Sequence, residues 1–156
     1  MQAERSGMIS QKAKYALRAL VALAKKPQGL PVFIGDIAES ENIPKKFLEQ
    51  ILLDLKHHGL VASRRGKAGG YGLLRPADTI SFGEVLRIID GPIAPLPCLS
   101  RRAYQRCEDC VDEDSCRIRK VFADIFWSYL LLIESLSLAD MLRSDAVAGQ
   151  VLGVQS

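Results

Sequence analysis

The chain has 156 residues, of which 48% are hydrophobic and 25% charged, proportions typical of one domain with a core of its own. No apolar run of membrane-spanning length is free of charges, and the N-terminus has no hydrophobic signal region, so we expect a cytoplasmic protein without a membrane partner. Residues 8–76 contain twelve Lys and Arg against five Asp and Glu, whereas residues 77–156 contain eight against twelve, so only the first half is expected to meet a polyanion.

Helical periodicity predicts three helices in the first part of the chain. Apolar residues recur at helical spacing over about residues 10–25, again over 34–40, and again over about 44–58. Pro44 suits the first position of the third helix, and Gly59 suits its C-terminal cap. The second and third helices, joined by a tight turn, fit a helix-turn-helix whose later helix would reach DNA bases. The alternative is a helix pair that only packs a core.

A basic β-hairpin is predicted next. Residues 60–63 and 71–74 have the composition of strands, and the glycine-rich segment 64–70 between them carries three cations. Cations on a narrow hairpin can enter a minor groove or bind phosphates, which is the behaviour of a DNA-binding wing. The alternative is an ordinary solvated hairpin. The segment is not a nucleotide-binding loop, because its Gly-Lys pair lacks the required earlier glycine and the following Ser or Thr.

Two further helices are predicted beyond the hairpin. Ser81 is a predicted N-cap, with Glu84 completing a capping box, for a helix that ends near residue 89. From 118 to 136 the apolar residues cover more than one helical face, so this helix must be buried on nearly all sides. We expect a second copy of the chain to cover it, which makes the protein a homodimer. The alternative is a central helix in a monomer. A short helix is expected at 137–142.

All four cysteines lie between these two helices, with eight, two and five residues between them: Cys98, Cys107, Cys110 and Cys116. In the cytoplasm such a cluster more often binds metal or performs redox chemistry than forms structural disulfides. Thiolates favour zinc or an iron–sulfur cluster, and the single closely spaced pair is less typical of a zinc ribbon. The alternatives are free thiols that act as a peroxide or disulfide switch, and inert cysteines, which the polar loop disfavours.

Nothing in the sequence predicts an enzyme. It contains no nucleophile–base pair, no metal-hydrolase motif and no nucleotide loop. His57 and His58 are the only histidines, and they stand at the end of the third predicted helix, where the helix dipole favours them. We do not expect them to bind a metal.

Several segments together resemble the bacterial iron–sulfur transcription regulators of the IscR, NsrR and RirA type. They are residues 15–18, 47–52 and 65–71, the cysteine loop and the long helix, within about residues 8–143. The resemblance implies a homodimeric winged helix-turn-helix repressor or activator that binds double-stranded DNA. It also implies a cluster near the DNA-binding domain, whose loss, oxidation or nitrosylation changes DNA affinity.

The resemblance places base contacts at Phe47, Glu49 and Gln50, and wing contacts at Arg65 and Lys67. With the neighbouring cations, the predicted DNA-binding residues are Lys45, Lys46, Phe47, Glu49, Gln50, Arg64, Arg65 and Lys67. The predicted cofactor is a 2Fe–2S or 4Fe–4S cluster, with zinc as the alternative. Its predicted ligands are Cys98, Cys107, Cys110 and Cys116.

The chain departs from the family pattern in its ligand set. Family members commonly use three cysteines. Arg119 stands where the IscR type has its histidine ligand, and Lys14 stands where the NsrR type has an aspartate ligand. We hypothesise that the fourth cysteine replaces the missing ligand, or that one of Cys107 and Cys110 is a spare or resolving thiol.

The predicted fold is mainly α with a small β-hairpin. A winged helix-turn-helix domain over 8–91 precedes a cluster-binding loop over 92–117, a dimerisation helix over 118–143 and a flexible tail over 144–156. The predicted function is transcription regulation in response to iron, iron–sulfur status, redox state or nitric oxide. One alternative is a thiol-redox or zinc-sensing regulator without a cluster. Another is an iron–sulfur electron carrier or assembly factor, which leaves the basic hairpin unexplained.

Overall fold

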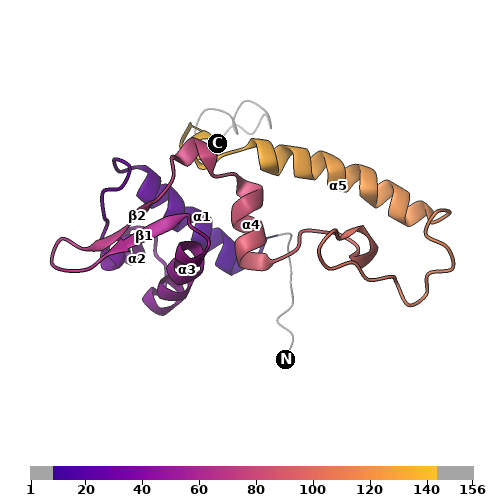
Figure 1. The fold of residues 1–156 in the computed structure, drawn as a ribbon, viewed down its shortest axis with the longest axis horizontal. Coiled ribbons are helices and arrows are strands. Elements are labelled where there is room, and N and C mark those ends of the chain that lie inside the picture. Colours follow the sequence, from indigo (N-terminus) through magenta and orange to yellow (C-terminus); the bar gives the residue numbers. More distant parts are fainter. Residues whose placement is uncertain (1–8, 144–156) are drawn as a thin grey trace.

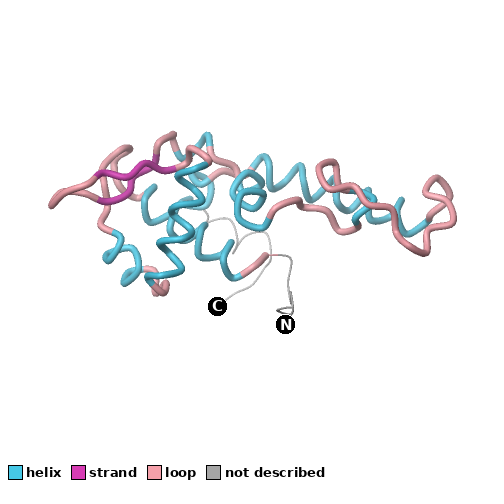
Figure 2. Tube along the Cα trace, turned by 60° about the horizontal axis from the view of Figure 1, so that its bottom comes forward, coloured by secondary structure: helices cyan, strands magenta, loops and turns pink. Residues whose placement is uncertain are grey.

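The computed structural model describes residues 9–143, so the expected tail at 144–156 lies outside the described residues. A body of helices and one hairpin carries a long arm (Figure 1). The body contains α1 (Gln11–Ala24), α2 (Ile34–Ser40), α3 (Lys45–His57), β1 (Val61–Arg64), β2 (Gly70–Leu73), the 3-10 turn η1 (Ala77–Thr79) and α4 (Phe82–Asp90). Seen from a second direction in Figure 2, the hairpin lies at one end of the molecule and the arm at the other. The mainly helical fold with a small hairpin is confirmed.

The arm leaves the body after α4 and returns to it. It contains the 3-10 turn η2 (Pro97–Leu99), the cysteine loop and α5 (Arg117–Ser135). A final helix, α6 (Leu138–Arg143), packs on α1 of the body. The segment that leads into α6 pairs with the segment that leads into α4. Phe82 N–H donates to Leu136 O at 2.9 Å, and Leu138 N–H donates to Ile80 O at 3.0 Å.

Local signals account for most helix ends. The Ser10 hydroxyl accepts a hydrogen bond from Ala13 N–H at 3.0 Å and so caps α1. Gly59 has a φ of 74° directly after α3, a conformation that glycine adopts without cost. Pro44 precedes α3 as its N-cap residue, with an extended ψ of 126°. The helix therefore begins at Lys45, one residue after the predicted start at Pro44.

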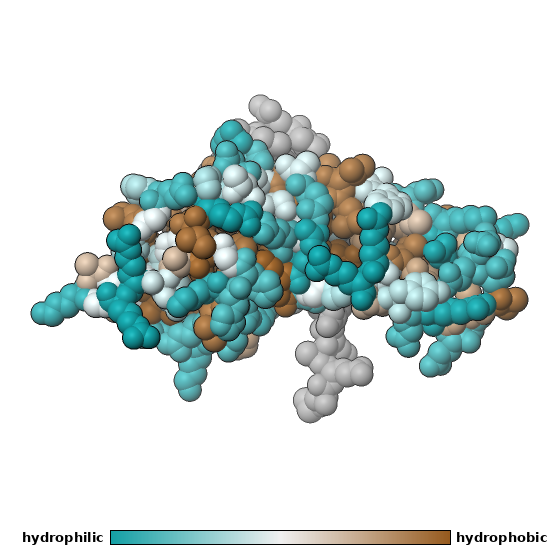
Figure 3. Space-filling view, viewed as in Figure 1, coloured by the Kyte–Doolittle hydropathy of each residue, from teal (hydrophilic) through white to brown (hydrophobic). Residues whose placement is uncertain are grey.

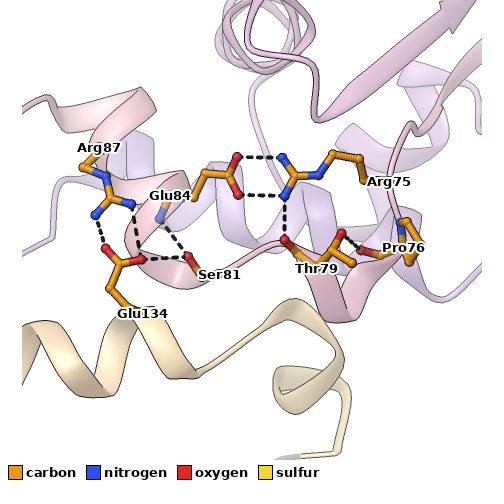
Figure 4. Close-up of polar contacts among 7 residues, drawn as sticks. All are labelled: Arg75, Pro76, Thr79, Ser81, Glu84, Arg87 and Glu134. Atoms are coloured by element: carbon orange, nitrogen blue, oxygen red, sulfur yellow. Dashed lines mark hydrogen bonds and ion pairs between the residues drawn. The ribbon is translucent and has the colours of Figure 1, made fainter.

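The capping box predicted at α4 is only half correct. The Ser81 hydroxyl accepts from Glu84 N–H at 3.1 Å, as expected of an N-cap. The Glu84 carboxylate does not reach back to Ser81; it accepts two hydrogen bonds from the Arg75 guanidinium, at 2.7 and 3.0 Å (Figure 4). A bidentate, charge-assisted pair is stronger than one bond to a backbone amide, so the carboxylate turns to Arg75.

The hairpin is backed by a segment that precedes α2. β1 and β2 are antiparallel, with Val61 opposite Leu73 and Arg64 opposite Gly70. Relative to the predicted strands, β1 begins one residue later and β2 begins one residue earlier. On the outer side of β2, Val32 N–H donates to Tyr71 O at 2.8 Å, and Tyr71 N–H donates to Val32 O at 2.9 Å. The wing is therefore fixed to the helix-turn-helix by backbone pairing as well as by its own ladder.

We expect Gly70→Ala to destabilise the fold by about 3 kcal/mol or more, because a positive φ and a backbone clash combine there. Gly70 has a φ of 148°, and a Cβ on it would lie 2.2 Å from Val32 O. Gly66→Ala is the matched control: its φ is 103°, but a Cβ there meets nothing. We expect the control to cost only about 1–2 kcal/mol of backbone strain. Denaturant unfolding measures both, and equal losses would contradict the close approach of Val32.

One core joins the body to the end of the arm. The buried face of α1 contacts α3, α4 and α6. The core side chains include Leu20, Leu48, Ile51, Leu52, Leu55, Leu60, Ile80 and Val85, and also Ile133 of α5 and Leu138 of α6. The body is therefore built from two stretches of chain, with the arm between them.

Candidate nucleic-acid interface and cysteine loop

The helix α3 has one buried and one exposed face. Its buried residues are Leu48, Ile51, Leu52 and Leu55. All five residues of α3 that were predicted to bind DNA are exposed: Lys45, Lys46, Phe47, Glu49 and Gln50. Phe47 is 55% exposed, and its ring meets the edge of the Tyr15 ring with centroids 6.4 Å apart. The structure thus presents these residues together at the surface, with α1 supporting Phe47 from below.

Among residues 9–143, the exposed cations of α3 and the hairpin have no acidic partner. The ion pairs among the described residues use other cations, such as Lys12 with Asp54 and Arg75 with Glu84. None of these pairs involves Lys45, Lys46, Arg64, Arg65 or Lys67. Since these five side chains are all exposed, the surface they form is positive and free to meet a polyanion.

Polar contacts fix α3 relative to its neighbours. Lys12 of α1 donates to the Asp54 carboxylate at 2.8 Å, and this hydrogen bond is the main reason that the pKa of Asp54 is lowered. Lys56 donates to the Ser63 hydroxyl at 2.6 Å, which joins α3 to β1. The helix and the hairpin are therefore held as one unit, although both present their cations outward.

The four cysteines lie in different surroundings within the arm. Cys98 is only 7% exposed, because its turn η2 packs against α5. Cys107, Cys110 and Cys116 are half-buried, and all four thiols are free. The expectation that the polar loop offers no buried place for a cysteine is wrong for Cys98, since the covering surface comes from a helix later in the chain.

Each of the other thiols has a different neighbour. Desolvation first, and then the nearby Cys98, raise the pKa of the Cys107 thiol. The nearby Cys110 thiol is the main cause of the raised pKa of the Arg106 guanidinium. The sulfur of Cys116 accepts from Arg119 N–H at 3.4 Å and caps α5.

The side chains of the loop have the chemistry of ligands for a thiolate-bound centre, but they are not gathered around one point. Four thiols within one loop are the ligand type of iron–sulfur clusters and of structural zinc. In residues 9–143, however, no group of three or more His, Cys, Asp or Glu is arranged to hold a metal ion. Cys98 is buried where η2 meets α5, whereas the Cys116 sulfur caps the start of that helix. Gathering all four requires the loop to rearrange.

Contacts between the loop and α5 were not foreseen from the sequence. The Arg101 guanidinium lies 4.6 Å from the centre of the Trp127 ring, a cation–π contact that holds the loop on the helix. Arg106 also donates to the carbonyls of Cys110 and Val111, at 3.2 and 3.0 Å. The sequence gives no signal for the Arg101 contact, which joins the loop to a residue of α5 more than twenty residues later.

The base of the arm is fixed by Glu134. Its carboxylate accepts hydrogen bonds from both the Arg87 guanidinium and, at 3.3 Å, the Ser81 hydroxyl (Figure 4). Arg87 is the main cause of the lowered pKa of Glu134. Glu134 also lies directly over Gly83, where a Cβ would be 2.5 Å from its carboxylate. The end of α5 is thus connected to α4 by charge and by close packing.

Most of α5 is uncovered. Ile133 is its only buried residue, so the alternative of a central helix within one chain is wrong. One set of side chains follows alternate spacings of four and three residues: Ile118, Phe122, Ile125, Tyr129, Leu132 and Leu136. Apart from the half-buried Tyr129, these are 40 to 62% exposed. In Figure 3 hydrophobic residues reach the surface where α5 lies. This spacing is that of a coiled-coil seam, and we call these six residues the α5 seam.

The helix pair α2–α3, the basic hairpin and the supporting α1 define a winged helix-turn-helix DNA-binding protein. The Rrf2 family, described as iron-dependent transcriptional regulators, matches residues 9–144. The chain therefore belongs to the Rrf2 family, and its fold and relatives make it a helix-turn-helix transcriptional regulator. No described helix has the length and apolar character needed to cross a bilayer.

Individual relatives agree with this assignment. An rrf2-like HTH-type transcriptional regulator of Rhodobacter capsulatus is 57% identical, over 93% of this chain and 99% of the relative. The structure of CymR, the global cysteine regulator of B. subtilis, is 30% identical with a TM-score of 0.66, over 85% of this chain and 94% of CymR. The structure of T. potens IscR is 27% identical with a TM-score of 0.69, over 99% and 97% of the two chains.

Proposed function

We propose that the protein is a homodimeric regulator whose DNA affinity is set by an iron–sulfur cluster bound to Cys98, Cys107, Cys110 and Cys116. The observation that carries this proposal is the position of Cys116, which caps α5 at the end of the cysteine loop. The other end of α5 is attached to α4 through Glu134. A change in the loop therefore acts on a helix that leads directly to the DNA-binding body.

The proposed DNA contacts follow from the free surface of α3 and the hairpin. Phe47, Glu49 and Gln50 would face base edges, because they stand in the first turns of the second helix of the helix-turn-helix. Lys45, Lys46, Arg64, Arg65 and Lys67 would contact phosphates or a narrow minor groove. The absence of acidic partners for these cations, among the described residues, supports this role.

We expect Arg65→Ala to weaken operator binding by roughly 1–3 kcal/mol, because Arg65 is an exposed wing cation that has no ion-pair partner in the described part of the chain. Fluorescence anisotropy with an operator duplex measures this loss. Lys120→Ala removes one exposed charge from α5 and is the control for net charge alone. Unchanged affinity in Arg65→Ala, or an equal loss in Lys120→Ala, would remove the wing from the interface.

The proposed dimer is formed through the α5 seam. Six apolar side chains at coiled-coil spacing, mostly exposed in one chain, are costly to leave in water and complementary to a second copy. A dimer also gives the protein two helix-turn-helix units for two half-sites, which greatly raises affinity over a single unit.

The cluster, when bound, supplies a centre that iron supply, oxidants or nitric oxide can alter. The chain's own residues orient the loop around it: Arg101 holds the loop on Trp127, and Arg106 and Arg119 offset the negative charge of the thiolates. Cys98 is sheltered by α5, which limits solvent access to one ligand. A zinc-bound or purely thiol-based sensor is the second candidate, and the four free thiols of the loop are the observation that favours the thiol chemistry.

Anaerobic purification followed by iron, sulfide and zinc analysis and a visible spectrum tests the cluster. We expect iron with matching sulfide and charge-transfer absorption. Operator binding is then measured across a salt series for the loaded and the chelator-treated protein, and the two forms should differ in affinity, with both affinities falling steeply as salt rises. Zinc in place of iron and sulfide, or equal DNA affinities for the two forms, would overturn the proposed sensing mechanism and leave the DNA-binding assignment in place.

A further inference from the structure

We propose that Arg119 is a positioning residue for the bound centre, and that its Nε–H donates a hydrogen bond to a metal-bound sulfur of the cysteine loop. The observation behind this proposal is a buried donor without an acceptor. Arg119 Nε is buried, and it has no hydrogen-bond partner among the described residues. The inference rests on the proposed function, because it concerns the same loop and the same thiolates.

A buried donor without a partner is rare in a folded protein. The large majority of buried polar atoms are paired, because a donor that leaves water without finding an acceptor destabilises the fold. Arginine stays protonated, so the Nε atom remains a donor and cannot itself bind a metal. In residues 9–143 no other buried side-chain nitrogen or oxygen lacks a partner, so this feature points to one place in the molecule.

The guanidinium lies where the two halves of the cysteine loop meet. Arg119 Nη2 is 4.0 Å from Glu113 Oε2, and Glu113 stands between the last two cysteines. The other oxygen of this carboxylate accepts from the hydroxyl of Tyr104, which stands between the first two cysteines. The backbone N–H of Arg119 also donates to the Cys116 sulfur at 3.4 Å. A centre held by the loop would therefore form close to this side chain.

The carboxylates of the loop do not supply the missing acceptor. The distance of 4.0 Å from Arg119 Nη2 to Glu113 is beyond hydrogen-bond range. Asp112 accepts from two backbone N–H groups later in the loop, at 3.4 and 3.0 Å. A group that enters the loop must therefore bring the acceptor with it. Metal-bound thiolates and cluster sulfides are negatively charged acceptors, and hydrogen bonds to them tune such centres.

The proposal gives different signs for the metal-free and the loaded protein. Arg119→Met keeps an unbranched side chain and removes the guanidinium. In the metal-free protein this change removes an unsatisfied donor, so the denaturant midpoint should stay the same or rise. In the loaded protein it removes a hydrogen bond to the centre, so the affinity for the metal should fall by about 10–100-fold. An arginine with a purely structural role would instead lower the metal-free midpoint when replaced.

Arg119→Lys separates the charge from the hydrogen bond. Lysine keeps the positive charge but has no planar N–H at the Nε position, so we expect this variant to lose metal as Arg119→Met does. Arg117→Met is the matched control, since Arg117 is exposed and stands two residues earlier on the same helix. The control should change neither the midpoint nor the metal affinity. Full rescue by lysine would show that charge alone acts, and would overturn the proposed hydrogen bond.

The measurements use the full chain purified without oxygen, with folding checked by circular dichroism. Iron and sulfide per chain are followed during competition with a chelator, and the reduction potential is measured by titration of the visible spectrum. Both Arg119 variants should lose iron at least about tenfold faster. Both should also have a lower potential, because a hydrogen bond to sulfur favours the more negative, reduced centre. Zinc added to the metal-free protein is the second probe, since zinc-bound thiolates accept the same hydrogen bond.

Two results would overturn the inference: metal retention and potential that are unchanged in both Arg119 variants, or a lowered metal-free midpoint in Arg119→Met. The proposed function is read separately, from the iron and sulfide content of the unsubstituted chain. An iron-loaded chain that responds to neither variant refutes only the hydrogen bond. A chain that binds zinc but not iron, with zinc affinity weakened in both variants, refutes only the cluster, and a chain that binds neither metal refutes both.

Discussion

Leu132→Glu should convert the dimer into a monomer and weaken operator binding by roughly a hundredfold, because one chain then occupies one half-site without the gain from linkage. Leu132 is 61% exposed in the single chain and is the fifth of the six residues of the α5 seam. A second copy packed on the seam would bury this carboxylate without a partner, and such burial costs on the order of several kcal/mol.

Leu131→Glu is the matched control. Leu131 is the neighbouring residue on the same helix, is more exposed at 72%, and undergoes the same chemical change. It lies about 100° away around the helix, outside the seam. Sedimentation or light scattering should find the Leu131 variant dimeric and the Leu132 variant monomeric. If the two variants dissociate equally, or neither dissociates, the seam is not the interface.

Cys116→Ser should remove most of the bound iron while leaving α5 intact. Cys116 has two separable roles, since its sulfur is a proposed ligand and also caps α5 by accepting from Arg119 N–H. Serine is a favourable N-cap, so this replacement preserves the cap and removes the thiolate. Cys98→Ala should lose iron as well, because the departures of Arg119 and Lys14 from the family pattern leave the chain dependent on its cysteines.

Ser115→Ala, next to Cys116 but without a thiol, is the control for damage to the loop. Iron and sulfide are measured per chain after anaerobic purification, and helix content is measured by circular dichroism. Full iron content in Cys98→Ala or in Cys116→Ser would disprove the hypothesis that the fourth cysteine replaces the missing ligand. Comparison of Cys107→Ala with Cys110→Ala then shows whether one of this pair is spare.

The helices and the hairpin were predictable because their signals are local. Apolar periodicity, the Ser10 and Ser81 caps and Gly59 each act within a few residues, and α1, α2, α3 and α4 lie where these signals put them. In the described part of the chain the wing cations form no ion pair, and this could be anticipated in part because few acidic residues lie near them in sequence. The residue-level DNA contacts stay a prediction.

What the sequence did not reveal depends on contacts between distant segments. Glu84 binds Arg75 rather than Ser81, because the loop before α4 brings a guanidinium to its carboxylate. Cys98 is buried by α5, a helix that begins nineteen residues later, after the whole cysteine loop. Glu134 meets Arg87 and Gly83 across the base of the arm. Composition describes a segment by its own residues, and these three features are decided by residues outside it.

The discontinuous core has a consequence for truncation and for changes in the arm. Ile133 and Leu138 are buried in the same core as α1, α3 and α4, so the segment between α4 and the end of α5 is an excursion anchored at both ends. A fragment that stopped at residue 91 would lose both side chains from the core, which means that the DNA-reading body cannot be isolated by simple truncation. The tip of the excursion, by contrast, contributes little to that core. The residues of the cysteine loop can therefore change without removing a side chain from the core of the body.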